Sequence, residues 1–564
     1  MPMNNRESIP PASLPSLPGT TQLLCELVVV ASIGAAYTAN WVLRTGKGVG
    51  WDQKNYQYYG AYALLSGRLD YDLAPGGMQS WLNPLVYIPQ FWLVNHLSPM
   101  AAASSFAAVQ ALNGVLIYAL ARLVFRSGAR WLAVGIALLA TVAGMSDPYL
   151  FAQLGSTESD YFVSLPVLGA LCCLGWAIGS ESAQLRRGVA YGAAGFLLGV
   201  AAGLKWTCFV YVVGMTAALL ILWRPLRLDL RRFLSYAAGG VLGFLPAGGL
   251  WSWHLWSQYR NPTFPYWNDL FRSPWHIPSD FRDMRFLPQS TEAAISFPFQ
   301  WLVGLHPTSE TPFRDARFAI LAVLVAVVIA ALIGKWLARI WRPAGEVKTS
   351  NLAASPAHLW LLLTFSVISY IVWIRLFAIQ RYLSPLTLLS GLLILVALDL
   401  LLPERSAKLA AWVLLASFSL YWMETEPKSW RQPYGSEWFG VHLAAEARAP
   451  NTLFVMLGGG PMGYIVPFLP PSSRVLGLRE IPPLEQAETA LFRRAQEIIA
   501  RHSGPIRSLS VEPLADVDSD HMKRFGLILD PEGCRRFRSE TDQFTTCPMS
   551  RQHTPEAPPT TPGG

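Results

Sequence analysis

The sequence predicts an α-helical polytopic membrane protein with about eleven transmembrane helices and a small extramembrane α/β domain at its C-terminal end. Three observations predict this class. Hydrophobic residues make up 52% of the 564 residues and charged residues only 14%, against roughly 25% charged in ordinary soluble domains. Apolar blocks recur that can cross a hydrocarbon layer of ~30 Å. The last part of the chain changes to short β-like runs. This composition excludes a soluble enzyme, a collagen and a small disulfide scaffold.

The predicted transmembrane domain extends over residues 21–424. Its apolar blocks lie near 21–43, 103–125, 131–150, 161–180, 188–204, 206–223, 233–253, 316–334, 357–377, 383–402 and 408–424. Residues 1–20 contain five prolines and are expected to form a flexible cytoplasmic tail. A cleaved signal peptide is the alternative. An uncleaved anchor is favoured because only Arg6 is basic ahead of the first block, which continues through Trp41.

Lysine and arginine in the connections predict the orientation. If the N-terminus is cytoplasmic, every inside loop is basic. The residues concerned are Arg126, Arg130, Arg186, Arg187, Arg224, Arg227, Arg231, Arg232, Lys335, Arg339, Arg342, Lys348, Arg405 and Lys408. This agreement requires that 81–99 does not span, and its three prolines fit an interfacial helix. The formal charge of +8 therefore reflects topology, and nucleic acid is not expected as a partner.

Three pieces are predicted to lie on the outer side: the loops 44–102 and 254–315, and a small α/β domain over 425–551. The domain is predicted from apolar runs at 452–457, 474–478, 506–511 and 526–529, with a helical stretch near 484–501. Residues 552–564 are expected to be disordered. Cys534 and Cys547 fall in the outer domain, where a disulfide would persist. The other four cysteines fall in spans and are expected to pack as small hydrophobic residues.

Asp52 is the preferred catalytic candidate. It follows the first span directly, in the run Trp51 to Tyr59 that also contains Tyr56. A carboxylate at a membrane surface among aromatic residues is partly desolvated, which raises its pKa and makes it a better proton acceptor. The alternative is an N-cap of the helix that starts at Asn55.

A second group of acids precedes the fourth span. Asp147, Glu158 and Asp160 share this outer connection. An acid facing Asp52 could orient the base, bind a metal or hold a substrate hydroxyl, and Asp160 is the preferred candidate. The alternative is that these acids are solvated in the loop.

Basic residues stand at the outer ends of several spans. Lys205 separates two apolar blocks, and a cation buried there should face a polar cavity or an anion. Arg375 and the pair Arg381-Tyr382 lie at outer ends of later spans, against the positive-inside tendency. A lipid phosphate would explain them, since guanidinium suits bidentate phosphate contact. Snorkelling or interfacial anchoring is the alternative for each taken alone.

Two further segments have a motif-like appearance. The run 259–268, with Arg260 and Asn261, is dense in proline and aromatic residues, which suits either the wall of an amphiphile site or an interfacial belt. Gly458 to Gly463 satisfies G-x-G-x-x-G, but prolines break the helix that a dinucleotide site needs, so these glycines are interpreted as a tight turn. Motifs of metalloproteases, ATPases and serine hydrolases do not occur.

These residues together resemble the GT-C superfamily of membrane glycosyltransferases, in particular a bacterial branch that uses polyprenyl-phosphate sugars. The similar segments are Trp51-Asp52 to Tyr59, Gly67-Arg68-Leu69 to Asp72-Leu73-Ala74-Pro75, Asn83-Pro84-Leu85, Gly155-x-Thr157 with Asp160, Gly203-Leu204-Lys205, Asn261-Pro262 to Phe264-Pro265, and Arg381-Tyr382. The resemblance covers roughly residues 20–425. It implies a bacterial inner-membrane protein with the C-terminal domain in the periplasm.

The resemblance also implies roles. Asp52 would be the general base for an acceptor hydroxyl of a glycan, lipid or protein, and Asp160 would assist it. Lys205 and Arg381 would neutralise the departing lipid phosphate, with Arg260 as a helper, and Tyr56, Asn261 and Tyr382 would contact substrate. A single displacement would invert the anomeric carbon. Relatives of protein mannosyltransferases and lipid A aminoarabinose transferases often have an acidic pair where this chain has Asp52-Gln53. The need for a divalent metal is therefore left open.

Two other classes compete with this hypothesis. A lipid or polysaccharide transporter predicts charges near mid-membrane and repeated halves, whereas the charges here cluster at one face and no repeat is visible. A noncatalytic envelope assembly factor could share the fold, because fold does not fix function. Such an adaptor should tolerate Asp52→Asn.

Overall fold

The computed structural model describes most of the chain. The described residues are 19–126, 129–180, 184–341, 353–354, 356–402, 404–422, 424–425, 431–478, 481, 488–511 and 516–552. The predicted terminal tails lie almost wholly outside these ranges, as do Arg342, Lys348 and most of the segment before the helix predicted near 484–501.

Within the described ranges, eight helices are long and apolar enough to cross a membrane. They are α1 (Thr20–Thr45), α4 (Pro99–Val124), α7 (Asp160–Gly179), α8 (Gln184–Leu204), α10 (Leu230–Phe244) continued by η5 (Leu245–Gly249) and α11 (Leu250–Tyr259), α14 (Arg317–Trp341), α15 (Pro356–Leu376), and α16 (Ser384–Leu401) with η6 (Gln380–Leu383) before it. Three shorter apolar helices are α5 (Arg130–Met145), α9 (Phe209–Ile221) and α17 (Arg405–Trp422). These helices coincide with the eleven predicted blocks, so the predicted polytopic helical fold is confirmed.

Helix α16 forms the centre of the bundle. It packs against α4, α5, α7, α14, α15 and α17, and nearly all of its residues are buried. Helix α1 lies at the periphery and leaves Leu24, Val28 and Ile33 more than half exposed. Apolar side chains exposed in this way on a span are suited to contact lipid.

Helices α8 and α10 pack unusually closely through glycine. A Cβ added at Gly195 would collide with the carbonyl of Tyr236, and one at Gly199 with the carbonyl of Gly240. The missing side chains let the two backbones touch, as in small-residue interfaces between membrane helices. The Asn83 amide donates to the carbonyls of Gly203 and Ala247 at 2.8 and 2.6 Å, which fastens the first outer loop to the end of this pair.

The segment 81–99 contains no helix long enough to cross a membrane. It contains η3 (Leu85–Tyr87) and α3 (Ile88–His96). The nine residues of α3 rise only ~14 Å. This length agrees with the prediction that the segment does not span.

The part of the chain after residue 430 forms a separate sheet domain, called the tail domain below. Its strands are β7 (Leu453–Leu457), β8 (Arg474–Gly477), β9 (Ile506–Val511), β10 (Leu527–Leu529), β11 (Arg535–Arg538), β12 (Gln543–Thr546) and β13 (Pro548–Arg551), and its helices are α18 (Ala490–Arg501) and α19 (Asp516–Arg524). Strand β7 lies parallel between β8 and β9. The other edge of β9 pairs antiparallel with both β12 and β13. A disulfide joins Cys534 to Cys547 across the β11–β12 hairpin.

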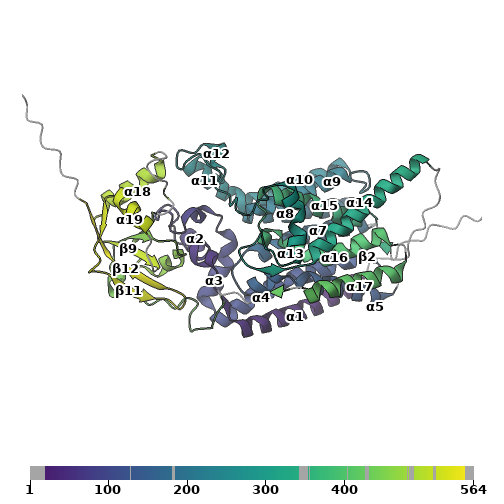
Figure 1. The fold of residues 1–564 in the computed structure, drawn as a ribbon, viewed down its shortest axis with the longest axis horizontal. Helices are drawn as coiled ribbons and strands as arrows, with labels where there is room; N and C mark the ends of the chain where they lie inside the picture. Colours follow the sequence, from purple (N-terminus) through teal and green to yellow (C-terminus); the bar gives the residue numbers. More distant parts are fainter. Residues whose placement is uncertain are drawn as a thin grey trace, which may run out of the picture.

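The tail domain lies at one end of the helical bundle, with α2 (Tyr58–Leu65) and α3 between the two (Figure 1). The first outer loop joins it directly, because Leu73 forms a parallel bridge to Leu476 on β8. Lys47 is fully buried and its ammonium lies 2.6 Å from the Glu540 carboxylate. The end of the bundle that carries the tail domain is called the outer end below.

Candidate functional site

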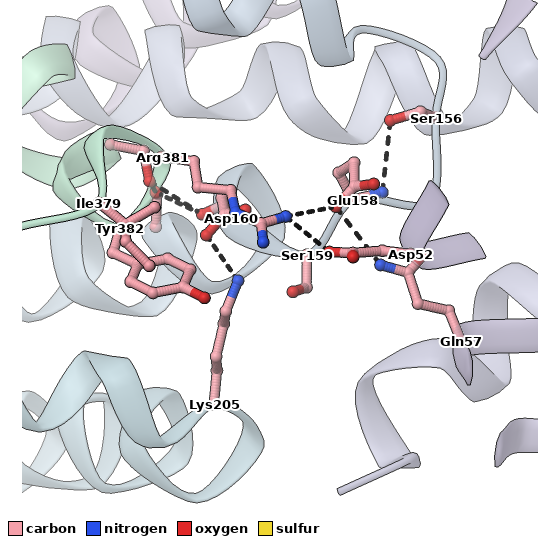
Figure 2. A network of polar contacts seen from close by, with 12 residues as sticks. Asp52, Gln57, Ser156, Glu158, Ser159, Asp160, Lys205, Ile379, Arg381 and Tyr382 are labelled. Carbon is pink, nitrogen blue, oxygen red and sulfur yellow. Dashed lines mark hydrogen bonds and ion pairs between the residues drawn. The ribbon is translucent and has the colours of Figure 1, made fainter. Parts of the chain in front are cut away.

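Four segments that are distant in sequence meet at the outer end. They are the π-helical turn η1 (Gln53–Gln57), the loop just before α7, the connection between α8 and α9, and η6. Figure 2 shows Lys205 and Arg381 reaching from two of these segments toward the carboxylates of Asp52, Glu158 and Asp160. The structure thus brings together the residues that the sequence singled out at the ends of separate spans.

Arg381 connects three carboxylates. Its guanidinium lies 2.6 Å from Asp52, 3.7 Å from Glu158 and 3.7 Å from Glu310. The side chain of Asp52 is 12% exposed and that of Arg381 20%, so this ion pair is largely shielded from solvent. One guanidinium atom, Nε of Arg381, is buried without a hydrogen-bond partner among the described residues.

Asp52 does not cap the helix. Its backbone is already helical, with φ of −61°, and its side chain makes no capping hydrogen bond. The carboxylate points instead to Arg381 and accepts a hydrogen bond from the hydroxyl of Tyr56 at 3.3 Å. The alternative of a simple N-cap is therefore wrong, and Asp52 belongs to the site.

Lys205 and Asp160 form the second ion pair. The ammonium lies 2.6 Å from one oxygen of Asp160, whose side chain is 2% exposed. The other oxygen, Oδ2, is buried with no hydrogen-bond partner within the described part of the chain. Lys205 lies between α8 and α9, and its ammonium is bound by Asp160. This contact argues against the alternative that the side chain extends to the lipid headgroups.

Tyr382 lies beside both cations. The Lys205 ammonium is 4.8 Å and the Arg381 guanidinium 5.4 Å from the centre of its ring, which places both within the range of cation–π attraction. Its backbone carbonyl accepts from the hydroxyl of Tyr211 at 2.6 Å. The ring therefore keeps the two cations on one side of the site.

Glu158 is buried in the same cluster, although it was not the acid preferred from sequence. Its carboxylate accepts a hydrogen bond from the amide of Gln57 at 3.4 Å, and Gln57 in turn accepts from Thr157 at 2.5 Å. Burial, with a further contribution from the charge of Asp52, raises the pKa of Glu158 to about 8. Its buried state could not be predicted, because a loop acid is usually solvated.

Three other basic or polar candidates lie away from this cluster. Arg260 ends α11 in a left-handed conformation with an exposed side chain. Asn261 is buried and supports its own turn, accepting from the backbone of Thr263 and donating to the carbonyl of Tyr266. Arg375 is exposed in the last turn of α15, a position that suits interfacial anchoring. The structure gives none of these three a contact with the site residues.

The first outer loop also supplies Tyr87, whose hydroxyl lies 3.4 Å from that of Ser159. Asp147 lies in a different network, close to the Arg317 guanidinium at 3.7 Å.

Among the described residues, no group of three acidic, histidine or cysteine side chains could hold a metal ion. Gln53, which stands where an acidic pair would place its second acid, is buried, and neither of its amide atoms has a hydrogen-bond partner in the described ranges.

No family model and no curated protein matches this chain. Among solved structures, it is similar to ArnT from Cupriavidus metallidurans, in crystal structures bound to undecaprenyl phosphate and in the apo state. The first likeness covers 94% of this chain and 98% of the other, with 13% identity and a TM-score of 0.39. The second covers 93% and 98%, with 13% identity and a TM-score of 0.40. At these values the function has to be argued from the site.

Proposed function

We propose that the chain is a membrane glycosyltransferase that moves a sugar from a polyprenyl-phosphate donor to an acceptor hydroxyl at the outer end. One observation carries the proposal: two cations and three acidic side chains from four separate segments converge at the outer end of the bundle. Such a one-sided arrangement suits chemistry on a lipid headgroup at the membrane surface, whereas alternating access needs sites nearer mid-membrane.

Lys205 and Arg381 are suited to receive the leaving phosphate. As the bond between the anomeric carbon and the phosphate oxygen breaks, its electron pair goes to that oxygen and negative charge builds there. Preorganised cations stabilise this transition state more than the bound donor, because the phosphate carries more negative charge in the transition state. Tyr382, which lies within cation–π range of both cations, supports their common orientation.

Asp52 is suited to take the proton of the acceptor hydroxyl as its oxygen attacks the anomeric carbon. Its ion pair with Arg381 at 2.6 Å would open on substrate binding, so that the sugar lies between Asp52 and the cation that faces the leaving group. Attack from the face opposite the phosphate inverts the anomeric carbon. Asp160, with one oxygen already bound to Lys205 and the other unpartnered, would position Lys205 or accept from the acceptor.

The test is sugar transfer by purified protein in liposomes, with a panel of radiolabelled polyprenyl-phosphate sugars. Asp52→Asn should lower the rate by about 100- to 10,000-fold, since a general base contributes that much. Lys205→Ala and Arg381→Ala should each cost about 100-fold or more, because they remove charge from the leaving-group side.

Arg375→Ala is the matched control for Arg381→Ala, because Arg375 is exposed at the end of the preceding helix. It should leave transfer unchanged. Full activity of Asp52→Asn would contradict the proposed base. If no donor in the panel reacts and Asp52→Asn still moves lipid, a transporter is indicated instead. If no donor reacts and Asp52→Asn still supports polysaccharide assembly, an assembly adaptor is indicated.

A further inference from the structure

A cavity of about 290 Å³ lies between the first outer loop and the tail domain. Its size is near the lower end of the roughly 300–1,000 Å³ typical of small-molecule sites. The side chains that matter are Trp51 and Asn55 from the start of the first loop and Gln79 from further along it. The tail domain contributes the glycine run 458–460.

Glycines allow the two walls to approach. A Cβ at Gly463 would collide with the carbonyl of Asn55, and a Cβ at Gly477 with the carbonyl of Ala74. Gly458 adopts a φ of +85°, a conformation that favours glycine. The glycine run that resembled a nucleotide motif is thus a turn that brings backbone against the first outer loop.

The lining is polar but uncharged. None of the described residues that line the cavity is acidic or basic. The Asn55 amide nitrogen donates to the carbonyl of Gly76 at 2.9 Å and to the amide oxygen of Gln79 at 3.4 Å, which leaves the Asn55 oxygen as an acceptor and the Gln79 amide nitrogen as a donor. Trp51 is 44% exposed and presents a large aromatic face, with Met456 and Met462 completing the apolar part.

We propose that this cavity binds a neutral sugar ring of the acceptor, which would make the acceptor a carbohydrate. An aromatic face with a few amide and backbone groups suits a polyhydroxylated ring, which has apolar C–H faces and an equatorial set of hydroxyls. A phosphate or a charged peptide would find no counter-charge in this lining. The inference rests on the proposed function, since Trp51 directly precedes the proposed base Asp52.

The acceptor is favoured over the donor sugar as the source of the ring. The cations proposed to hold the donor phosphate, Lys205 and Arg381, do not line this cavity. They lie on the Tyr382 side of the site, whereas Trp51 and Asn55 face the tail domain. Ring binding here would leave the donor in place, and the ring would lie next to the turn that carries Asp52 directly after Trp51.

The first experiment measures binding by saturation-transfer NMR on the full-length protein in detergent. The probes are the methyl α-glycosides of glucose, galactose and mannose, with sodium glucuronate as the charged comparison. At least one neutral glycoside should bind, and Trp51→Ala should weaken its binding about fivefold or more. Trp51→Phe should retain most of it. Trp253→Ala, which removes another exposed tryptophan, is the control and should change nothing.

Binding of none of the neutral glycosides, or equal loss in Trp253→Ala, would overturn the sugar site. Preference for glucuronate would overturn its neutral character. Asp52→Asn should bind the glycoside like the wild type, which separates this test from that of the proposed base.

The second experiment measures transfer kinetics once a donor reacts. Trp51→Ala should raise the KM for the acceptor and leave the KM for the donor unchanged. A raised donor KM with an unchanged acceptor KM would overturn the assignment to the acceptor. Glycoside binding that depends on Trp51, in a protein that transfers from no donor, would retain the sugar site and contradict the proposed function instead.

Discussion

Glu158 is a carboxyl group that is 8% exposed and lies within 3.7 Å of Arg381. Its pKa is raised from 4.5 to about 8, chiefly by burial. A carboxyl whose pKa is higher in the folded protein binds its proton more tightly there than in the unfolded chain. Stability therefore falls as the pH rises from about 4.5 to about 8 and then levels off.

Glu158→Gln should remove this dependence, since glutamine mimics the protonated carboxyl. Between pH 6 and pH 8 the wild type should lose about 1 kcal/mol per pH unit relative to the variant. Thermal unfolding in detergent measures this difference. Glu532→Gln, at an exposed position, is the control and should follow the wild type. Parallel curves for wild type and Glu158→Gln would mean that Glu158 is ionised throughout.

At the residue level, the sequence was informative where a charge stood out from its surroundings. Lys205 and Arg381 stand out in the sequence because each lies at the predicted outer end of an apolar block, whereas basic residues are expected at the cytoplasmic ends. Glu158 could not, because its burial depends on Gln57 and Arg381, which come from distant segments. The prediction for Arg260 and Asn261 rests on a local run of aromatic residues and proline, and such a run does not indicate which way a loop faces.

At the level of elements, the packing of α8 against α10 fixes where Lys205 lies. Gly199→Ala would place a methyl group against the backbone of Gly240. The helices would have to separate, at a cost of about 1–3 kcal/mol typical of overpacking. We expect a lower melting temperature and a loss of transfer, because the α8 end that carries Lys205 would shift away from Asp160.

Gly188→Ala is the matched control on the same helix. A Cβ at Gly188 meets no atom within 4 Å, so this variant should be as stable as the wild type or slightly more so, alanine being the better helix former. Equal melting temperatures for the two variants would contradict the close backbone contact between α8 and α10.

The elements themselves were predictable to different degrees. All eleven apolar blocks correspond to helices, because hydrophobic length is a strong local signal in a membrane protein. The α8–α10 contact was missed, although glycines at four-residue spacing, 195, 199 and 203, carried its signal. Strands β11 to β13 were missed as well. β11 has the sequence Arg-Arg-Phe-Arg with one buried residue. Its strand conformation therefore depends on pairing with β12 and could not be predicted from its composition.

On the scale of the whole molecule, buried Lys47 helps to hold the tail domain over the site. Its ammonium also donates to the carbonyls of Glu437 and Trp438 at 3.0 and 2.7 Å. Lys47→Met removes these bonds and the ion pair with Glu540, and docking should weaken by about 2 kcal/mol, as for hydrogen bonds to charged groups.

Limited chymotrypsin digestion, which does not cut at lysine, should then release fragments of the tail domain faster, while the helical bundle stays intact. Lys523→Met, which breaks a pair between two side chains that are each 76% exposed, is the control and should digest at the wild-type rate. Unchanged digestion of Lys47→Met would mean that apolar contacts alone dock the tail domain.

The orientation of the whole chain is predicted from charge, with the N-terminus cytoplasmic and the tail domain outside. A C-terminal alkaline phosphatase fusion should therefore be active and a C-terminal green fluorescent protein fusion dark. Fusions after Arg224, in a predicted inside loop, should behave in the opposite way. An active phosphatase after Arg224 would reverse the predicted topology and place the site in the cytoplasm.

The parallel bridge between Leu73 and Leu476 has a consequence for biogenesis. Nearby, Arg68 donates to the carbonyl of Pro471, a residue 403 positions later in the chain. Because the chain is synthesised from its N-terminus, the first outer loop has no partner until the tail domain has been made. Closing so long a loop is entropically costly and slow. The nascent chain would lack the tail-domain side of the cavity at Trp51 throughout its synthesis, so that the proposed sugar site would form only in a finished chain.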